Sequence, residues 1–185
     1  MKLNVDRLTG VRSTTPVRIY DSEMSLFYYN EPKGGDLFFN LPTGNYFVES
    51  GDLNFCEPLK FSKIENIAPT RSLKRPERME IYIGENPHKC SVYQEKGIIL
   101  FDRNFYESLG VLGREFIYNH EMAHFDYDGS EAEEIACDVY AANQMLENGY
   151  NPSQLYSIAV FTLSLGESNP RVLALNEKLK NIQIL

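Results

Sequence analysis

The chain lacks several features that define whole classes of protein. Among its 185 residues there are no tryptophans, only three cysteines and only three histidines. Cys56, Cys90 and Cys137 are widely spaced and odd in number, which argues against a disulfide scaffold and favours a reducing compartment. The hydrophobic fraction of 43% and the charged fraction of 24% are instead typical of a folded globular protein.

Long apolar runs and an excess of positive charge are absent as well. No stretch approaches the roughly 18 to 20 apolar residues that span a bilayer, and residues 1–18 contain no apolar core of a signal peptide. The 26 acidic residues outnumber the 18 basic ones, so neither nucleic acid nor an anionic membrane is expected as a partner. We expect a cytoplasmic protein, or a virion protein if a phage encodes it, made without a signal or latency peptide.

Composition divides the chain into three parts. Residues 1–65 hold short aromatic and β-branched runs between proline and glycine turns, which predict antiparallel strands at 17–20, 24–29, 37–40 and 46–49. Residues 66–79 contain two prolines and several basic residues without periodicity, and are predicted to be a connector.

Residues 80–185 form the third part, and their pattern predicts strands followed by helices. The strands are expected at 81–84, 91–94 and 97–102, and the helices at 104–109, 114–125, 130–148, 152–165 and from 169 towards the carboxyl end. Strands followed by helices predict an α+β fold, with an antiparallel β region in the first 65 residues.

The most informative feature is the sequence HEMAH at residues 120–124. At helical spacing, His120 and His124 lie one turn apart on one face, so both imidazoles can reach one ion while Glu121 lies beside it. Phe116 and Ile117, one turn earlier, indicate that this face points inward. Zn²⁺ is the metal expected, with Glu121 as the base for a water molecule in the open coordination position.

A third protein ligand has to come from outside this helix. The extended pattern HExxHxxGxxH is excluded because Tyr127 and Ser130 stand where it requires glycine and histidine. The following segment offers carboxylates instead, and Glu133 is accounted for by a capping box with Ser130. Glu134 is our choice, one turn before Asp138, and Glu131 is the reserve ligand.

Asp138 and Cys137 follow Glu134 on the same predicted helix. We expect Asp138 to hydrogen-bond a ligand imidazole on the side away from the metal. The alternative is that Asp138 is a solvated or locally paired carboxylate. Cys137 is expected to pack in the core rather than bind metal.

HEMAH together with EIACDVYAA, which begins at Glu134, resembles the gluzincin zinc metallopeptidases. The nearest patterns are those of prenyl-protein-protease-type peptidases and of metallopeptidases that cleave phage-type repressors. The resemblance covers residues 80–146 and implies a zincin-like domain with Zn²⁺ held by His120, His124 and Glu134. It also implies Glu121 as the base, while Cys137 stands where these families usually have alanine.

Two further parts of a peptidase site stay open at this point. An edge strand to which a peptide substrate adds is expected at 81–84 or at 91–94. A group that stabilises the oxyanion is also expected, and the sequence does not choose among Tyr118, Tyr127, His88 and Arg171. By default, His88 and Arg171 are surface residues.

Three functions compete. The leading hypothesis is a zinc-dependent endopeptidase acting on a peptide or protein substrate. The second is a structural or assembly component, for example of a phage or viral particle, built on a zincin-like fold with or without activity. In that hypothesis the many aromatic residues of 1–65, among them Phe27, Tyr28, Tyr29, Phe38 and Phe39, supply protein contacts. The third is a regulatory module that senses or cuts a repressor.

Overall fold

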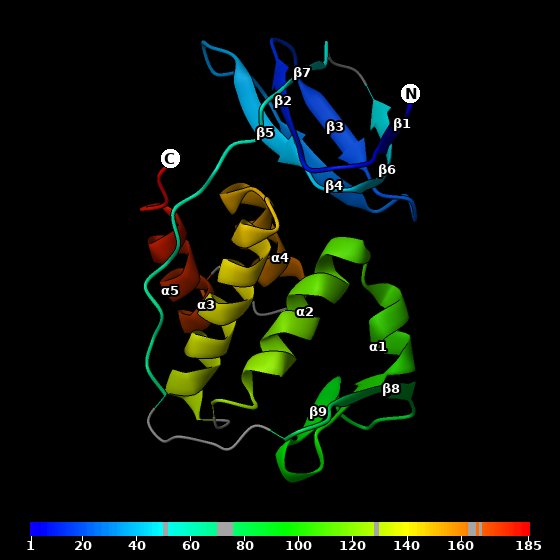
Figure 1. Cartoon of the computed structure of the whole chain (residues 1–185), viewed down its shortest axis with the longest axis vertical. Helices are drawn as coiled ribbons and strands as arrows, with labels where there is room; N and C mark the ends of the chain where they lie inside the picture. The colour runs from blue at the N-terminus through cyan, green and yellow to red at the C-terminus, as the bar shows by residue number, and fades with distance from the viewer. Residues whose placement is uncertain (50–51, 70–75, 128–129, 163–165, 167) are drawn as a thin grey trace.

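The computed structural model describes residues 1–185 except 50–51, 70–75, 128–129, 163–165 and 167. The chain has a mixed α+β fold, as predicted, with antiparallel sheets at the amino-terminal end and helices at the carboxyl-terminal end. Three layers follow one another along the longest axis: the amino-terminal strands, the helices, and a second β layer, called the small sheet below (Figure 1). Within the described residues, every helix is too short or too polar to cross a lipid bilayer.

The amino-terminal β layer consists of two antiparallel sheets. A four-stranded sheet has the order β1-β6-β3-β4, with bounds Lys2–Val5, Gly44–Glu49, Val17–Tyr20 and Leu26–Asn30. A three-stranded sheet has the order β5-β2-β7, with bounds Leu37–Leu41, Thr9–Ser13 and Asn54–Cys56. In β3 the buried Val17 and Ile19 alternate with more exposed neighbours, as expected of a strand with one face in the core.

Four of these strands match the predicted segments, and three were missed. β1 and β7 have only four and three residues, and Val11 is the only large apolar residue of β2. The predicted strand at 24–29 begins two residues late, at Leu26. Met24 has a positive φ of 62° in a turn where the carboxylate of Asp21 accepts hydrogen bonds from the backbone of Glu23 and Ser25. That turn conformation is incompatible with a strand.

The second β layer is a three-stranded sheet with β10 (Ile98–Asp102) in the centre, as its apolar sequence predicts. It pairs in parallel with β8 (Glu80–Gly84) and antiparallel with β9 (Cys90–Tyr93). A 3₁₀ turn, η1 (Gln94–Lys96), joins β9 to β10 and ends at Gly97. Gly97 has a φ of 67°, and a Cβ there would meet the carbonyl oxygen of Arg78 at 2.1 Å, so only glycine fits.

Five α-helices follow: α1 (Arg103–Ser108), α2 (Val111–Ala123), α3 (Glu131–Glu147), α4 (Pro152–Thr162) and α5 (Pro170–Leu179). They confirm the five predicted helices, although the predicted end of the fourth, at 165, lies outside the described residues. Ser130 occupies the N-cap position of α3, but its side chain makes no capping hydrogen bond to the helix. The predicted capping box is therefore wrong in that detail.

The helix that carries HEMAH begins three residues earlier than predicted. Gly110 is its N-cap and has no side chain to cap it, but the carboxylate of Asp21 accepts a hydrogen bond from Val111 N at 3.1 Å. A residue of the amino-terminal β layer thus completes the start of α2, which sequence periodicity could not indicate.

One continuous cluster of buried side chains joins the amino-terminal β layer to the helices, with members such as Ile19, Phe39, Phe116 and Met145. Buried amides connect the same two layers. Asn151, before α4, accepts a hydrogen bond from Asn40 N at 2.9 Å and donates to Asn40 O at 3.2 Å. The division at residues 65 and 80 into separate domains stays a prediction.

We expect Asn151→Ala to lower the free energy of unfolding by about 2–3 kcal/mol, because it leaves the buried polar groups of Asn40 without partners. Chemical denaturation measures this change. Asn181→Ala is the control, since Asn181 is exposed and bonds only its own helix end, and it should change stability by less than about 0.5 kcal/mol. Equal effects of the two substitutions would contradict this account of the layer contact.

Candidate metal centre

Three of the predicted site residues come from the carboxyl end of α2, where His120 and Glu121 lie in the last turn and His124 is the C-cap. His120 is buried, with 3% of its surface exposed, while Glu121 and His124 are partly buried. The imidazole rings of the two histidines have centroids 5.0 Å apart. Phe116 and Ile117 are buried one turn earlier, which confirms that the helix face carrying His120 points inward.

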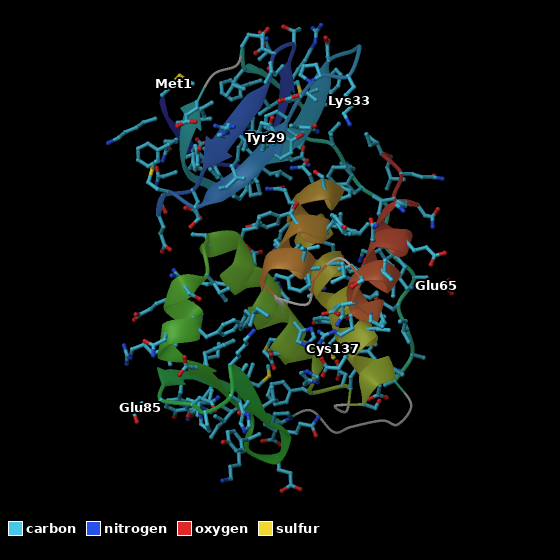
Figure 2. All side chains as sticks on the ribbon, turned by 180° about the vertical axis from the view of Figure 1, so that it is seen from behind. Met1, Tyr29, Lys33, Glu65, Glu85 and Cys137 are labelled. Atoms are coloured by element: carbon cyan, nitrogen blue, oxygen red, sulfur yellow. The ribbon has the colours of Figure 1, made fainter. Side chains whose placement is uncertain are left out.

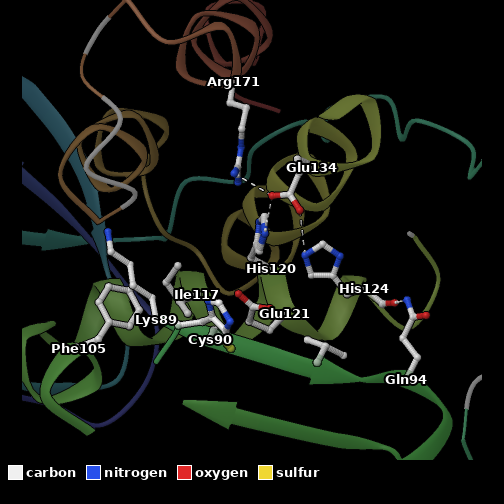
Figure 3. Close-up of a pocket in the computed structure, with 12 residues that line it drawn as sticks. Lys89, Cys90, Gln94, Phe105, Ile117, His120, Glu121, His124, Glu134 and Arg171 are labelled. Carbon is white, nitrogen blue, oxygen red and sulfur yellow. Dashed lines mark hydrogen bonds and ion pairs between the residues drawn. The ribbon is translucent and has the colours of Figure 1, made fainter. Parts of the chain in front are cut away.

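The third candidate ligand, Glu134, comes from α3. Among the described residues, the contact between α2 and α3 is the most extensive one between any two elements. Glu134 Oε2 lies 3.4 Å from His120 Nε2, and Glu134 Oε1 lies 3.4 Å from His124 Nε2. Figure 3 shows the carboxylate facing both imidazoles. One atom from each of the three residues lies within 4.8 Å of the others, so this cluster could hold a metal ion.

Asp138 lies behind the cluster, one helical turn after Glu134. It is 1% exposed, and its Oδ1 lies 2.8 Å from His120 Nδ1, the nitrogen that faces away from Glu134. Apart from this ion-pair contact, the buried His120 Nδ1 has no polar partner among the described residues. A carboxylate in this position orients an imidazole and increases its strength as a metal ligand.

Arg171, in the first turn of α5, contacts both Asp138 and Glu134. Its Nε and Nη2 donate to the two carboxylate oxygens of Asp138 at 2.9 and 2.8 Å, and Nη1 lies 2.8 Å from Glu134 Oε2. The expectation that Arg171 is a surface residue is therefore wrong. Arg171 was named only as one candidate for stabilising the oxyanion, and its pairing with Asp138 and Glu134 was not predicted, because nothing local in the sequence indicates that α5 begins over α3.

These contacts set the protonation of the cluster. Burial lowers the pKa of His120, but the contacts with Asp138 and Glu134 outweigh it and raise that pKa to about 9. Burial alone would raise the pKa values of Glu134 and Asp138, yet the contacts with His120 lower both below their ordinary range. The cluster thus attracts positive charge, and a cation bound at His120 Nε2 would replace a proton.

Two cysteine side chains also lie against the site. Cys137 is fully buried within the helical half of the molecule, as predicted, and its Sγ lies 3.6 Å from His124 Nδ1 (Figure 2). Cys90, on β9, is partly buried beside Glu121. The pKa of both thiols lies well above the ordinary value. Burial is the largest cause, and the nearby carboxylates add to it. Both thiols therefore stay neutral and make poor nucleophiles at neutral pH.

The cluster opens into a cleft of about 660 Å³ between α2, the small sheet and α5. β9 and the 3₁₀ turn that follows it form one side of the cleft, through Cys90 and Val92 of the strand and Gln94 of the turn. Gln94 Nε2 donates hydrogen bonds to His124 O and, at 3.1 Å, to Tyr127 O, so it ties this side of the cleft to the carboxyl end of α2.

The remaining predicted residues are placed as follows. His88 is exposed and lines the cleft. Tyr118 and Tyr127 do not line it, and the hydroxyl group of Tyr127 instead donates to Ile67 O at 2.7 Å. The side chain of Glu131, the reserve ligand, lies outside the described residues. Glu133 is 2% exposed and is not part of the cluster.

Comparison of the chain with models of known protein families, with curated proteins and with solved structures gives no match. The resemblance to gluzincins therefore stays an expectation drawn from the two short motifs. The geometry of the cluster carries the functional argument.

We expect about one divalent metal ion per purified chain, and its loss in His120→Ala and in Glu134→Ala, because each variant removes one of three ligands. Elemental analysis measures it. His88→Ala is the matched control, since it replaces the third histidine, which lies outside the cluster, and it should keep the metal. Loss of metal in all three variants, or in none, would contradict the assigned ligand set.

Asp138→Asn should weaken metal binding by about 10- to 100-fold, because the amide orients His120 less firmly and lacks the charge that strengthens its Nε2 as a ligand. Titration with zinc against a competing chelator measures the affinity. Asp36→Asn, which replaces a carboxylate bonded to Arg12 in the amino-terminal β layer, should leave the affinity unchanged. An unchanged affinity in Asp138→Asn would remove Asp138 from the site.

Proposed function

We propose that the chain is a zinc-dependent peptidase with a zincin-like site. The observation that carries the proposal is the convergence of two imidazole Nε2 atoms and one carboxylate on α2 and α3, each nitrogen 3.4 Å from a carboxylate oxygen. Tetrahedral zinc with bonds of about 2.0–2.1 Å requires a separation between ligand atoms of about 3.3–3.4 Å. The two nitrogen–oxygen distances have that length, each to a different oxygen of Glu134, and one atom from each residue lies within 4.8 Å of the others. Calcium and magnesium prefer sites built from oxygen alone, so the two nitrogens favour zinc.

The donor set leaves one coordination position for water or substrate. Zinc held by His120, His124 and Glu134 supplies a Lewis acid that polarises a carbonyl group and acidifies water. Glu121 lines the same cleft, where its carboxylate can accept the proton of the attacking water and pass it to the leaving amine. Asp138 holds His120 in the orientation that presents Nε2 to the metal.

The small sheet supplies a path for an extended substrate. Among the residues that the structure describes, β9 pairs only with β10, so its other edge is open, and its Cys90 and Val92 line the cleft. A peptide that adds to this edge lies beside the metal cluster. Of the two strands expected to serve this purpose, β9 rather than β8 borders the cleft.

A second candidate function, a component of a larger assembly, is favoured by a different observation. Met24, just before β4, is 56% exposed, and Leu26 and Tyr29, within β4, are 56% and 47% exposed. β4 is an edge strand of the four-stranded sheet. Exposed apolar side chains at a sheet edge are typical of protein contact surfaces. Of the other aromatic residues predicted to make contacts, Phe27, Tyr28 and Phe39 are buried in the core.

Glu121→Gln separates the two functions. In the zinc-loaded protein it should lower the rate of peptide cleavage by at least about 10³-fold, since the amide cannot take a proton from water, while metal content stays unchanged. A casein or peptide-library digest followed by mass spectrometry measures cleavage.

Glu107→Gln, on the exposed face of α1, is the control and should cleave like the unsubstituted chain. Cleavage that survives in Glu121→Gln would rule out Glu121 as the base. Absence of cleavage in the unsubstituted, zinc-loaded chain would favour the assembly function.

A further inference from the structure

The cleft extends beyond the metal cluster on the side away from Gln94. In Figure 3 the side chains of Lys89, Cys90, Phe105 and Ile117 lie together on one side of Glu121, and Gln94 lies on the other. Phe105 and Ile117 give this end an apolar wall built by α1 and α2. The following inference rests on the proposed peptidase function and concerns which substrate residue this end accepts.

Lys89 is held at this end by backbone contacts. Its carbonyl oxygen accepts a hydrogen bond from Asp102 N at 3.0 Å, and Asp102 Oδ1 in turn accepts one from Phe105 N at 2.9 Å. The start of β9 and the start of α1 are therefore fixed to each other. Lys89 Nζ lies 5.4 Å from the centroid of the Phe105 ring, so the side chain extends over the apolar wall.

The charges around the cleft distinguish Lys89 from the other basic groups. Arg171 is already paired with Asp138 and Glu134. Lys89 lines the cleft but forms no ion pair with any residue that the structure describes. The carboxylate of Asp102 instead caps the start of α1. This end of the cleft therefore combines an apolar wall with an ammonium group that has no carboxylate partner.

We propose that this end of the cleft is a subsite for an acidic side chain, glutamate or aspartate, next to the scissile bond of a peptide substrate. The methylene groups of such a side chain contact Phe105 and Ile117, and its carboxylate reaches the Lys89 ammonium. Because the chain as a whole carries a net charge of −8, it repels acidic peptides at long range. Lys89 supplies a local attraction at distances shorter than the screening length of about 8 Å.

The test compares three peptides that differ only by Glu, Gln or Lys next to the cleaved bond. Their binding to zinc-loaded Glu121→Gln protein is measured by calorimetry, and their kcat/KM with the active chain. We expect the Glu peptide to bind and react about five- to tenfold better at low salt, with the preference shrinking as salt is added. Lys89→Glu should reverse the preference, so that a Lys peptide replaces the Glu peptide as the better one.

Lys96→Glu is the matched control. It makes the same charge change on a lysine of the same small sheet that lies over an aromatic ring, 5.8 Å from the centroid of Tyr93, but it does not line the cleft. It should leave the preference for Glu over Gln unchanged.

The outcomes separate the subsite from the peptidase function. A Glu preference in binding that Lys89→Glu reverses, without cleavage of any peptide, would support the subsite and overturn the peptidase function. Cleavage with equal rates for Glu and Gln peptides, or with a preference that Lys89→Glu leaves intact, would overturn the subsite and leave the peptidase function standing.

Discussion

The packing of α2 against α3 is the contact on which the site depends. Every approach between His120 or His124 and Glu134 crosses this interface, as does the contact between His120 and Asp138. Near the site, Ala123 and other small buried side chains of one cluster lie between the helices. Small side chains let two helices approach closely, which brings a carboxylate of α3 to the imidazoles of α2.

The rest of the fold holds this helix pair in register. Asp21 of the amino-terminal β layer bonds the start of α2, and Gln94 after β9 bonds its end, so α2 is tied to both β layers. Arg171 of α5 pairs with Asp138 and Glu134 of α3 and compensates charges that would be costly to bury alone. Each layer of the molecule thus contributes to a site whose predicted ligands come from only two helices.

Local patterns in the sequence predicted the five α-helices and the central strand β10. The helix beginning with Pro152 and the last helix, beginning with Pro170, were placed correctly because proline is favoured in the first turn. The strands β1, β2 and β7 were not predicted, since few of their side chains reach the core and their pairing involves partners far along the chain. Alternation of buried and exposed residues is weak in such strands.

By itself, the sequence determined the spacing of His120, Glu121 and His124, because one helical turn places residues four apart on one face whatever surrounds the helix. It also narrowed the third candidate ligand to one short segment. Only the tertiary structure decided that Arg171 joins the cluster and that Cys90 borders it. Those contacts depend on how α5 and β9 pack against α2 and α3, and packing between elements distant in sequence leaves no periodic pattern in either of them.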